Sequence, residues 1–438
     1  MRVACLANIN NMMFILCRYL RDNGIDAHLI TLDDEPGHFS PEADSYDKDY
    51  LNYYTVLALT KSTIYKKDSI AILHKNLDDF DFFIGTDIAP ALLTLIGKNL
   101  DVFIPHGSDI YNLPFKQARE KSVNKVWWLS EKSTLSELQK IGIENTSTIL
   151  FPDEYDIHFP FKDKLKTKAQ YHNTSGPMVY IPQYTDLENN PNVKELKQYD
   201  FFKNLKVEND LVVFSHSRHN GFNLGKSLAV HQKGNDILIA GFSKFAKEHT
   251  SIRSKLIFFN YGMNIEASKE LIRQHKIEDH VIWMPLMQRK EIMFGLNMAT
   301  ISCGQFDNSW LTCGVVNETL ASNIPLLHYR QDDLYLDDYN ELYPLLNAKT
   351  SEDISNLLGD YIADPKFHKN KAKQGSEWLD KYTVKKPLKI ILNQLNKSLD
   401  NSSTTSTDNL NRVNRILKKH TFWDKVYRLQ GKIKSSLD

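Results

Sequence analysis

The residues whose types and spacing best suit the binding of an anion are two cationic side chains in a loop that precedes a predicted helix. Arg218 and Lys233 lie in a polar loop between the apolar run Leu211 to Phe214 and a helical pattern that Gly234-Asn235-Asp236 begins. Backbone N–H groups at a helix start attract an anion, and arginine and lysine neutralise it. The loop therefore predicts a phosphate site, although a solvated basic loop would show the same local pattern.

A glutamate and a histidine elsewhere have the types expected of a site for polar ligands. Glu318 heads a helical pattern in NETLASNIPLL, where a carboxylate accepts hydrogen bonds or simply favours the helix dipole. His106 follows the apolar run DVFIP, at the end of a strand, where site residues gather. Asp109 could contact a substrate or cap the turn after His106. Asn10 and Asn11, in the first strand-to-helix turn, tolerate left-handed backbone geometry and could meet a substrate.

These residues fall on an alternation of strand and helix patterns in both halves of the chain. Near-continuous apolar strands separated by helices predict a parallel sheet with helices on both faces. The alternation dissolves into polar, proline-containing sequence over 156–207 and then restarts. The predicted fold class is α/β: two doubly wound Rossmann-like domains with a C-terminal amphipathic helical tail. Among the expected strands are KVWWLS (Lys125 to Ser130) and MVYIP (Met178 to Pro182).

Composition shifts along the chain give the domain boundaries. We expect an N-terminal domain over 1–185, a C-terminal domain over 186–384, and a helix over 385–400 that could return to the N-terminal domain. A linker and a basic tail follow over 401–438, because NSSTTSTDN has the composition of a flexible connection. The acidic, tyrosine-rich segment from Asp33 to Tyr54 is interpreted as a loop or lid.

The tail has the pattern of a basic amphipathic helix. Apolar residues such as Leu410, Val413 and Leu417 recur at helical spacing, and lysines and arginines occupy the other positions. Such a helix binds a membrane surface or packs against protein, and the sequence leaves both open. The membrane interpretation predicts peripheral contact through residues 410–434.

Composition excludes some functions. Lys+Arg and Asp+Glu balance at 54 each, so no charge excess points to nucleic acid as a partner. The chain starts directly with a strand pattern rather than a signal-peptide pattern, and it has no apolar run long enough to span a bilayer. The cysteines have no metal-ligand spacing and fit a reducing compartment. We expect a cytoplasmic protein, with possible peripheral contact at the inner face of the plasma membrane.

The motifs together resemble the GT-B glycosyltransferases, and specifically the large retaining glycosyltransferase family 4. The resemblance rests on Arg218, on Lys233-Gly234, and on the run ATISCGQFDNSWLTCGVVNETLASNIPLL, in which Glu318 matches a family glutamate. FIPHGSD looks like the family loop that has a histidine near the sugar phosphate. The segment MPLMQRKEIMFGLNMATIS also looks like the family's, and it contains Pro285 and Leu286.

The resemblance implies roles for these residues. Arg218 and Lys233 would hold the diphosphate of a nucleotide-sugar donor, UDP- or GDP-sugar, and stabilise the charge that grows as the glycosidic bond breaks. Glu318 would accept hydrogen bonds from the ribose hydroxyls, and His106 would bond a sugar hydroxyl. No metal and no further cofactor are implied. The other residues expected to contact the donor are Pro285, Leu286, Gly304, Asp307 and Asn308. Those expected to contact the acceptor are Asn10, Asn11 and Asp109.

One departure from the family motif concerns the transferred sugar. A second glutamate that contacts this sugar in the family is replaced by Trp310, so the stereochemical outcome is open. The sequence therefore predicts a glycosyltransferase, retaining and metal-independent by resemblance, that acts on a glycan or lipid-linked acceptor in bacterial surface polysaccharide synthesis. A catalytically degenerate GT-B scaffold and a sugar-nucleotide epimerase of the same architecture remain as alternatives.

Overall fold

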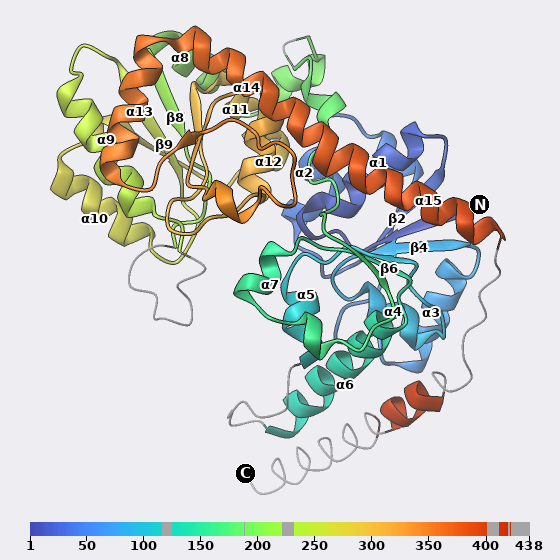
Figure 1. Cartoon of the computed structure of the whole chain (residues 1–438). Coiled ribbons are helices and arrows are strands. Elements are labelled where there is room, and N and C mark those ends of the chain that lie inside the picture. Colours follow the sequence, from blue (N-terminus) through green and yellow to red (C-terminus); the bar gives the residue numbers. More distant parts are fainter. Residues whose placement is uncertain (116–124, 188, 221–231, 401–410, 419–420, 422–438) are drawn as a thin grey trace, which may run out of the picture. The chain divides into compact units, whose positions relative to one another are not determined.

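The computed structural model describes residues 1–115, 125–187, 189–220, 232–400, 411–418 and 421, and the chain forms two compact units (Figure 1). Unit 1 contains Met1–Pro41, Asp49–Pro177 and Lys385–Asp438, and unit 2 contains Glu42–Lys48 and Met178–Val384. The main boundary thus falls after Pro177 rather than at residue 185. Two parallel sheets, one in each unit, match the predicted pattern of two α/β domains.

Unit 1 is built on a seven-stranded parallel sheet with the order β3-β2-β1-β4-β5-β6-β7. One face is covered by apolar residues of α3, α4 and α6, and the other by residues of α1 and α15, so both faces are buried. The strands are β1 (Arg2–Leu6), β2 (Asp26–Leu32), β3 (Tyr54–Leu57), β4 (Phe82–Gly85), β5 (Val102–Phe103), β6 (Thr148–Leu150) and β7 (Gln170–His172). The helices are α1 (Met12–Asp22), α3 (Lys67–Leu77), α4 (Ala89–Leu95), α5 (Ser108–Tyr111), α6 (Lys125–Glu144), α7 (Glu154–His158) and α15 (Lys386–Asp400).

Unit 2 repeats this design with a six-stranded parallel sheet in the order β10-β9-β8-β11-β12-β13. Residues of α9, α10 and α13 pack on one face, and residues of α8, α11, α12 and α14 on the other. The strands are β8 (Leu211–Phe214), β9 (Ser254–Phe259), β10 (Val281–Met284), β11 (Ile301–Cys303), β12 (Leu326–His328) and β13 (Leu346–Asn347). The helices are α8 (Tyr199–Glu208), α9 (Asn235–Glu248), α10 (Ile265–His275), α11 (Arg289–Met298), α12 (Gly314–Ala321), α13 (Ser351–Ala363) and α14 (Pro365–Leu379).

Both sheets reverse their strand order at one point, between β1 and β4 in unit 1 and between β8 and β11 in unit 2. Loops at the carboxyl ends of the strands on either side of such a point diverge and leave room for a ligand. The predicted α/β class with two doubly wound domains is therefore confirmed, and it locates the candidate sites at these two edges.

Two expected strands are wrong. KVWWLS belongs to α6 (Lys125–Glu144), and its β-prone residue types did not indicate this, because β-propensity depends strongly on context. MVYIP forms no strand; it leads into the 3-10 helix η6 (Ile181–Tyr184), and Pro182 lacks the N–H that a sheet ladder needs. Val179 and Tyr184 pack instead into the core of unit 2.

The segment interpreted as a loop or lid is divided between the units. The chain leaves unit 1 after Pro41, near the start of α2 (Pro41–Asp44), and returns to it at Asp49. Residues Glu42–Lys48, named the crossover segment below, belong to unit 2 although they lie in the N-terminal half of the sequence.

The C-terminal part belongs to unit 1. Ile391 and Leu395 of α15 are buried in the core on one face of the unit 1 sheet. The helical residues 411–418 place Val413 and Ile416, 4% and 7% exposed, in the core on the other face. This part of the tail thus packs against protein rather than presenting its apolar face to a membrane, whereas the linker 401–410 and most of the tail lie outside the described residues. None of the helices in the described ranges has the length and apolar character needed to cross a bilayer.

Candidate functional site

The candidate phosphate loop lies at the carboxyl end of β8, beside the point where the unit 2 sheet reverses its order. Arg218 is exposed in the loop after this strand, and Lys233 stands directly before α9. Gly234 caps this helix with φ +68°, and a Cβ there would lie 2.8 Å from Cβ of Phe306. Only glycine therefore allows the start of α9 to approach the loop after β11 this closely. The loop residues 221–231 lie outside the described residues.

Lys233 is held in a partly buried position at this helix start. Its Nζ donates to Oε1 of Gln305 at 2.6 Å, and its carbonyl accepts from the N–H of Phe306 at 3.1 Å. Burial lowers the pKa of Lys233, the positive charge of Arg218 lowers it further, and Asp307 opposes this shift. The structure thus brings two predicted cations within electrostatic range of each other. An anion placed between them would relieve their repulsion.

The loop after β11 holds further residues predicted to contact the donor. Gly304 is buried, and a Cβ there would lie 2.3 Å from Nδ1 of His328, so the loop and β12 require glycine for their close approach. His328 also joins the two ends of this loop, because Nδ1 accepts from the N–H of Gln305 and Nε2 contacts the carbonyl of Trp310 at 2.8 Å. Burial lowers the pKa of His328 to about 4, which keeps the ring neutral. Trp310 is 7% exposed.

Asp307 and Asn308 lie in the same loop. Burial raises the pKa of Asp307, and the negative charge of Asp236 at the start of α9 raises it further. A carboxylate thus stands near Lys233 in a place where the resemblance predicts contact with the donor. Pro285 and Leu286 follow β10 and are both exposed, Leu286 to 68%. Their positions leave their apolar surfaces open at the carboxyl edge of the sheet.

Glu318 lies in α12 and is nearly buried, with both carboxylate oxygens occupied. Oε1 lies 2.9 Å from Nε of Arg289, and Oε2 lies 2.8 Å from Nε2 of His216. Burial alone would raise the pKa of Glu318, but the charge of Arg289 and the hydrogen bond with His216 lower it, so the group stays ionised. The sequence predicted Glu318 as a site residue and missed Arg289, whose place at a helix start gives no local signal.

In unit 1 the predicted pair His106 and Asp109 follows β5. Asp109 is 1% exposed, and its carboxylate accepts from the N–H groups of Asp87 at 3.0 Å, His106 at 3.1 Å and Gly107 at 2.9 Å. Nδ1 of His106 lies 3.0 Å from Oδ2 of Asp109. Burial lowers the pKa of His106, but the charge of Asp109 raises it above its ordinary value overall. Asp109 therefore organises the turn and the histidine, in agreement with the capping interpretation.

The asparagines of the first strand-to-helix turn have the left-handed geometry that the sequence suggested. Asn10 and Asn11 have φ of 56° and 59°. Asn11 is 1% exposed, whereas Asn10 is partly exposed. Buried Asn8 accepts from the N–H of Phe14 at 2.9 Å and so holds the start of α1. Of the two predicted acceptor contacts in this turn, Asn10 has the side chain that solvent reaches.

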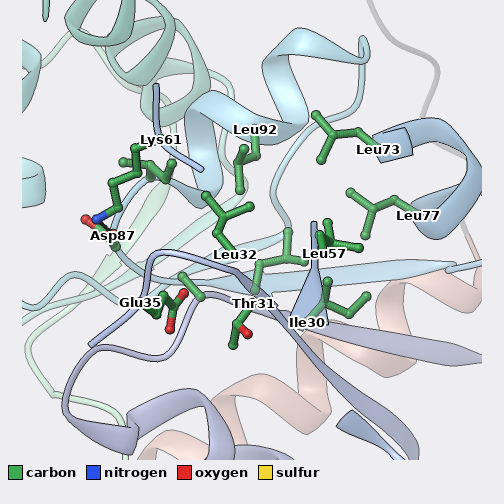
Figure 2. A pocket seen from close by; sticks show the side chains of 13 residues that line it. Ile30, Thr31, Leu32, Glu35, Leu57, Lys61, Leu73, Leu77, Asp87 and Leu92 are labelled. Carbon is green, nitrogen blue, oxygen red and sulfur yellow. Dashed lines mark hydrogen bonds and ion pairs between the residues drawn. The ribbon is translucent and has the colours of Figure 1, made fainter. Parts of the chain in front are cut away.

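The sequence missed a second group of charged residues at the same edge of unit 1. Figure 2 shows Lys61 reaching toward Asp87, with Glu35 nearby and apolar side chains to the right of these three residues. Nζ of Lys61 lies 2.5 Å from Oδ2 of Asp87. Glu35 and these two residues line a cavity of about 10 Å³, with room for roughly one water. Leucines that line the rest of it include Leu32, Leu57, Leu73, Leu77 and Leu92.

Glu35 is the most perturbed member of this group. Its Oε2 is buried and has no hydrogen-bond partner among the described residues. Burial raises the pKa of Glu35 to about 8, and the charge of Asp87 contributes, while Lys61 partly opposes the shift. Asp87 also has a left-handed φ of 51°, which is uncommon for a residue other than glycine. A carboxyl group that keeps its proton near neutral pH can donate or accept a proton in a reaction.

Within the part of the chain that the structure describes, no group of three or more His, Cys, Asp or Glu side chains is arranged to hold a metal ion. Metal independence stays a prediction, because the diphosphate-binding role is assigned to cationic side chains and does not itself exclude a metal.

No protein-family model and no curated protein sequence matches this chain. Its fold is similar to Anabaena HepE in complex with UDP, with a TM-score of 0.55 and 13% identity over 91% of this chain and 100% of HepE. It is also similar to sucrose-phosphate synthase of Thermosynechococcus elongatus, with a TM-score of 0.54 and 13% identity over 91% of this chain and 99% of the synthase. A third similar structure is UDP-GlcNAc 2-epimerase of Methanocaldococcus jannaschii, with a TM-score of 0.51 and 11% identity over 90% of this chain and 99% of the epimerase. These likenesses show the two-domain GT-B fold that the sequence predicted, and they do not assign a reaction.

Proposed function

We propose that this protein is a glycosyltransferase that uses a UDP-sugar and binds the donor diphosphate in unit 2. The observation that supports this most strongly is the placement of Arg218 in the loop after β8 and of Lys233 directly before α9, on the carboxyl edge of a GT-B sheet, where the charge of Arg218 contributes to lowering the pKa of Lys233. The similar structure of HepE was solved with UDP, with UDP and glucose, and with UDP-glucose. The same donor class fits two cations beside a helix start.

The proposed chemistry follows from where charge develops. The bond between the sugar anomeric carbon and the diphosphate breaks, and the diphosphate leaves with the electron pair. The acceptor hydroxyl oxygen forms the new bond to the anomeric carbon, and its proton passes to the leaving diphosphate or to water. Arg218 and Lys233 stabilise the leaving diphosphate. Glu318 accepts from the nucleotide ribose, the loop residues Gly304, Asp307 and Asn308 line the sugar side, and Pro285 and Leu286 offer apolar surface to the base.

The acceptor side of the proposal rests on unit 1. His106, oriented by Asp109, and the partly exposed Asn10 lie on its carboxyl edge and suit hydrogen bonding to sugar hydroxyls. A glycan or lipid-linked acceptor in bacterial surface polysaccharide synthesis is the substrate class that the family resemblance favours. Retention of anomeric configuration belongs to the same resemblance, and Trp310 in place of the sugar-contacting glutamate makes the product configuration the property to measure.

Release of free nucleotide from UDP-, GDP-, ADP- and CMP-sugars, with and without EDTA, tests the proposal. We expect release from one UDP-sugar that EDTA does not stop and that both Lys233→Ala and Glu318→Ala abolish. If no donor is turned over and both variants bind nucleotide with the affinity of the wild type, the site assignment is contradicted and a binding scaffold is favoured.

The charged group in unit 1 favours a second candidate, a sugar-nucleotide epimerase. Such a reaction needs acid–base groups, and Glu35 and Asp87 supply two carboxyl groups at one edge of the sheet. One similar structure is a UDP-GlcNAc 2-epimerase. Incubation with UDP-GlcNAc distinguishes the candidates, because an epimerase yields an isomeric UDP-sugar without free UDP, and Glu35→Gln would abolish that product.

A further inference from the structure

A buried network of charged side chains surrounds the candidate ribose-binding glutamate in unit 2. Arg289 stands between two carboxylates: its Nε lies 2.9 Å from Oε1 of Glu318 and 3.9 Å from Oδ1 of Asp44. His216 contacts the other oxygen of Glu318. The exposed fractions of the side chains are 11% for Arg289, 10% for Glu318 and 0% for Asp44. Charges this deeply buried interact strongly, because little water screens them.

Asp44 reaches this network from the crossover segment, and hydrogen bonds within unit 2 fix its position. Oδ1 of Asp44 accepts from the hydroxyl of Tyr184 at 3.0 Å, and its carbonyl accepts from Gln183 at 2.7 Å. The hydroxyl of Tyr46 donates to the carbonyl of Lys290 at 2.7 Å, next to Arg289 in sequence. A segment from the N-terminal half of the chain is thus built into the surroundings of Glu318.

Arg289 is fixed on more than one side. Besides its carboxylate neighbours, its Nη1 donates to the carbonyl of Met178 at 2.9 Å. A guanidinium held at several points fixes the direction of the carboxylate it contacts. Each oxygen of Glu318 accepts one contact from Arg289 or His216 and keeps a further lone pair, so the carboxylate can still accept hydroxyl hydrogens in a defined direction.

We propose that Arg289 and Asp44 are positioning residues for nucleotide recognition: Asp44 orients Arg289, and Arg289 holds Glu318 so that it accepts from the ribose hydroxyls. This inference rests on the proposed donor site in unit 2 and adds to it the crossover segment, which the sequence pattern placed with the N-terminal domain. The two residues act through Glu318 and do not touch the donor themselves.

The test compares the affinities for UDP and for 2′,3′-dideoxy-UDP, which lacks both ribose hydroxyls, by titration calorimetry on the full chain. We expect the wild type to prefer UDP by about tenfold or more, because a carboxylate built to accept hydroxyls is left unsatisfied by the analogue. Arg289→Lys and Asp44→Asn are expected to reduce this preference toward unity, raising the KM for the donor more than they lower kcat. Asp44→Asn keeps the experiment informative if Arg289→Lys does not fold.

Arg330→Lys is a matched control. Arg330 is also buried in unit 2, with Nε 2.7 Å from Oδ1 of Asp332 and Nη1 donating to the carbonyl of Tyr343 at 3.0 Å. A general loss of packing would affect this variant equally, whereas we expect it to keep the preference for UDP.

Three results would overturn the inference. If Asp44→Asn and Arg289→Lys both fold and keep the wild-type preference, Glu318 does not depend on them. If the wild type binds UDP through Lys233 but shows no preference for the ribose hydroxyls, the donor site stands and the positioning role fails. If the wild type binds no nucleotide, the proposed function fails together with the inference.

Discussion

The two units share the order of their first six strands, but their carboxyl edges present different polar groups. In unit 2 the edge offers Arg218 and Lys233, and the carboxylate of Glu318 is already paired with Arg289 and His216. In unit 1 the edge holds Glu35 and Asp87 around Lys61. On the proposed assignment, the same fold offers an anion site at one edge and groups suited to hydroxyl groups or a proton at the other. Function here resides in the loops after the strands and not in the sheets.

Burial changes the pKa of a charged group at each of the two edges. It lowers the pKa of Lys233 in unit 2 and raises the pKa of Glu35 in unit 1 to about 8. Both shifts weaken the charged form of an unliganded group, so a ligand that supplies the missing counter-charge or hydrogen bond binds where water is already largely excluded.

The largest effect is expected from Lys233→Ala, which removes a cation from the proposed diphosphate site of unit 2. UDP affinity should fall by about 100-fold or more, because a partly buried charge-assisted contact to a phosphate is lost. Titration calorimetry measures the change. Lys244→Ala is the control: Lys244 lies on α9 as well, but it is exposed and paired with Glu352, so the affinity of that variant should equal that of the wild type. Equal losses in both variants would mean that Lys233 has no special role.

The edge of unit 2 was the more predictable one, and the reason is sequence separation. Arg218, Lys233 and Gly234 lie on one contiguous strand, loop and helix, so local patterns are enough to find them. Glu35 and Asp87 follow different strands and meet only when the sheet has formed. No local pattern signals them, and Glu35 lies in a segment that was interpreted as a loop or lid.

The same reasoning explains the errors in the fold. The strand predicted at KVWWLS followed the β-prone residue types and missed the helix α6 to which these residues belong, since β-propensity is a weak guide to the structure of a short segment. The crossover segment contains no signal that it joins unit 2, because its partners Tyr184 and Arg289 are distant in the sequence. Patterns that repeat within one element were predictable, and contacts between distant elements were not.

The next effect concerns Asp109, which joins the turn after β5 to His106. Asp109→Asn should lower the free energy of unfolding by about 2–3 kcal/mol, since a buried carboxylate that accepts several N–H groups is weakened. The pKa of His106 is raised in the folded protein, so its contribution is present at acid pH and disappears as pH rises through the folded pKa. Thermal unfolding measures this: the unfolding temperature should change less between pH 5.5 and pH 8 in the variant than in the wild type.

The effect of Glu35→Gln on the free energy of unfolding should depend on pH. The pKa of Glu35 rises from 4.5 to about 8 on folding, so between these values the folded state holds a proton that the unfolded chain has released. Stability from this group therefore falls as pH rises across that window. At pH 9 the variant should be more stable than the wild type by on the order of 2 kcal/mol. Urea unfolding at pH 6 and pH 9 measures this, and Asp79→Asn, at an exposed carboxylate of the same unit, should show no such gain.

The smallest expected effect is that of salt. Raising NaCl from low to about 0.5 M should weaken UDP binding by only a few-fold, because Arg218 is exposed and screened whereas Lys233 is partly buried. Fluorescence or calorimetric titrations at several salt concentrations measure the slope. A decrease as steep as that of a wholly surface-exposed phosphate site would contradict the placement of Lys233.

Hydrogen exchange with and without UDP tests the central claim most directly, because it reports on both edges in one experiment. We expect UDP to slow amide exchange over residues 215–220, 232–236 and 304–308 of unit 2, with no change at residues 33–36 and 86–87 of unit 1, and we expect Lys233→Ala to abolish the effect. Protection confined to the edge of unit 1, or protection in unit 2 that survives Lys233→Ala, would contradict the assignment of the diphosphate to Arg218 and Lys233.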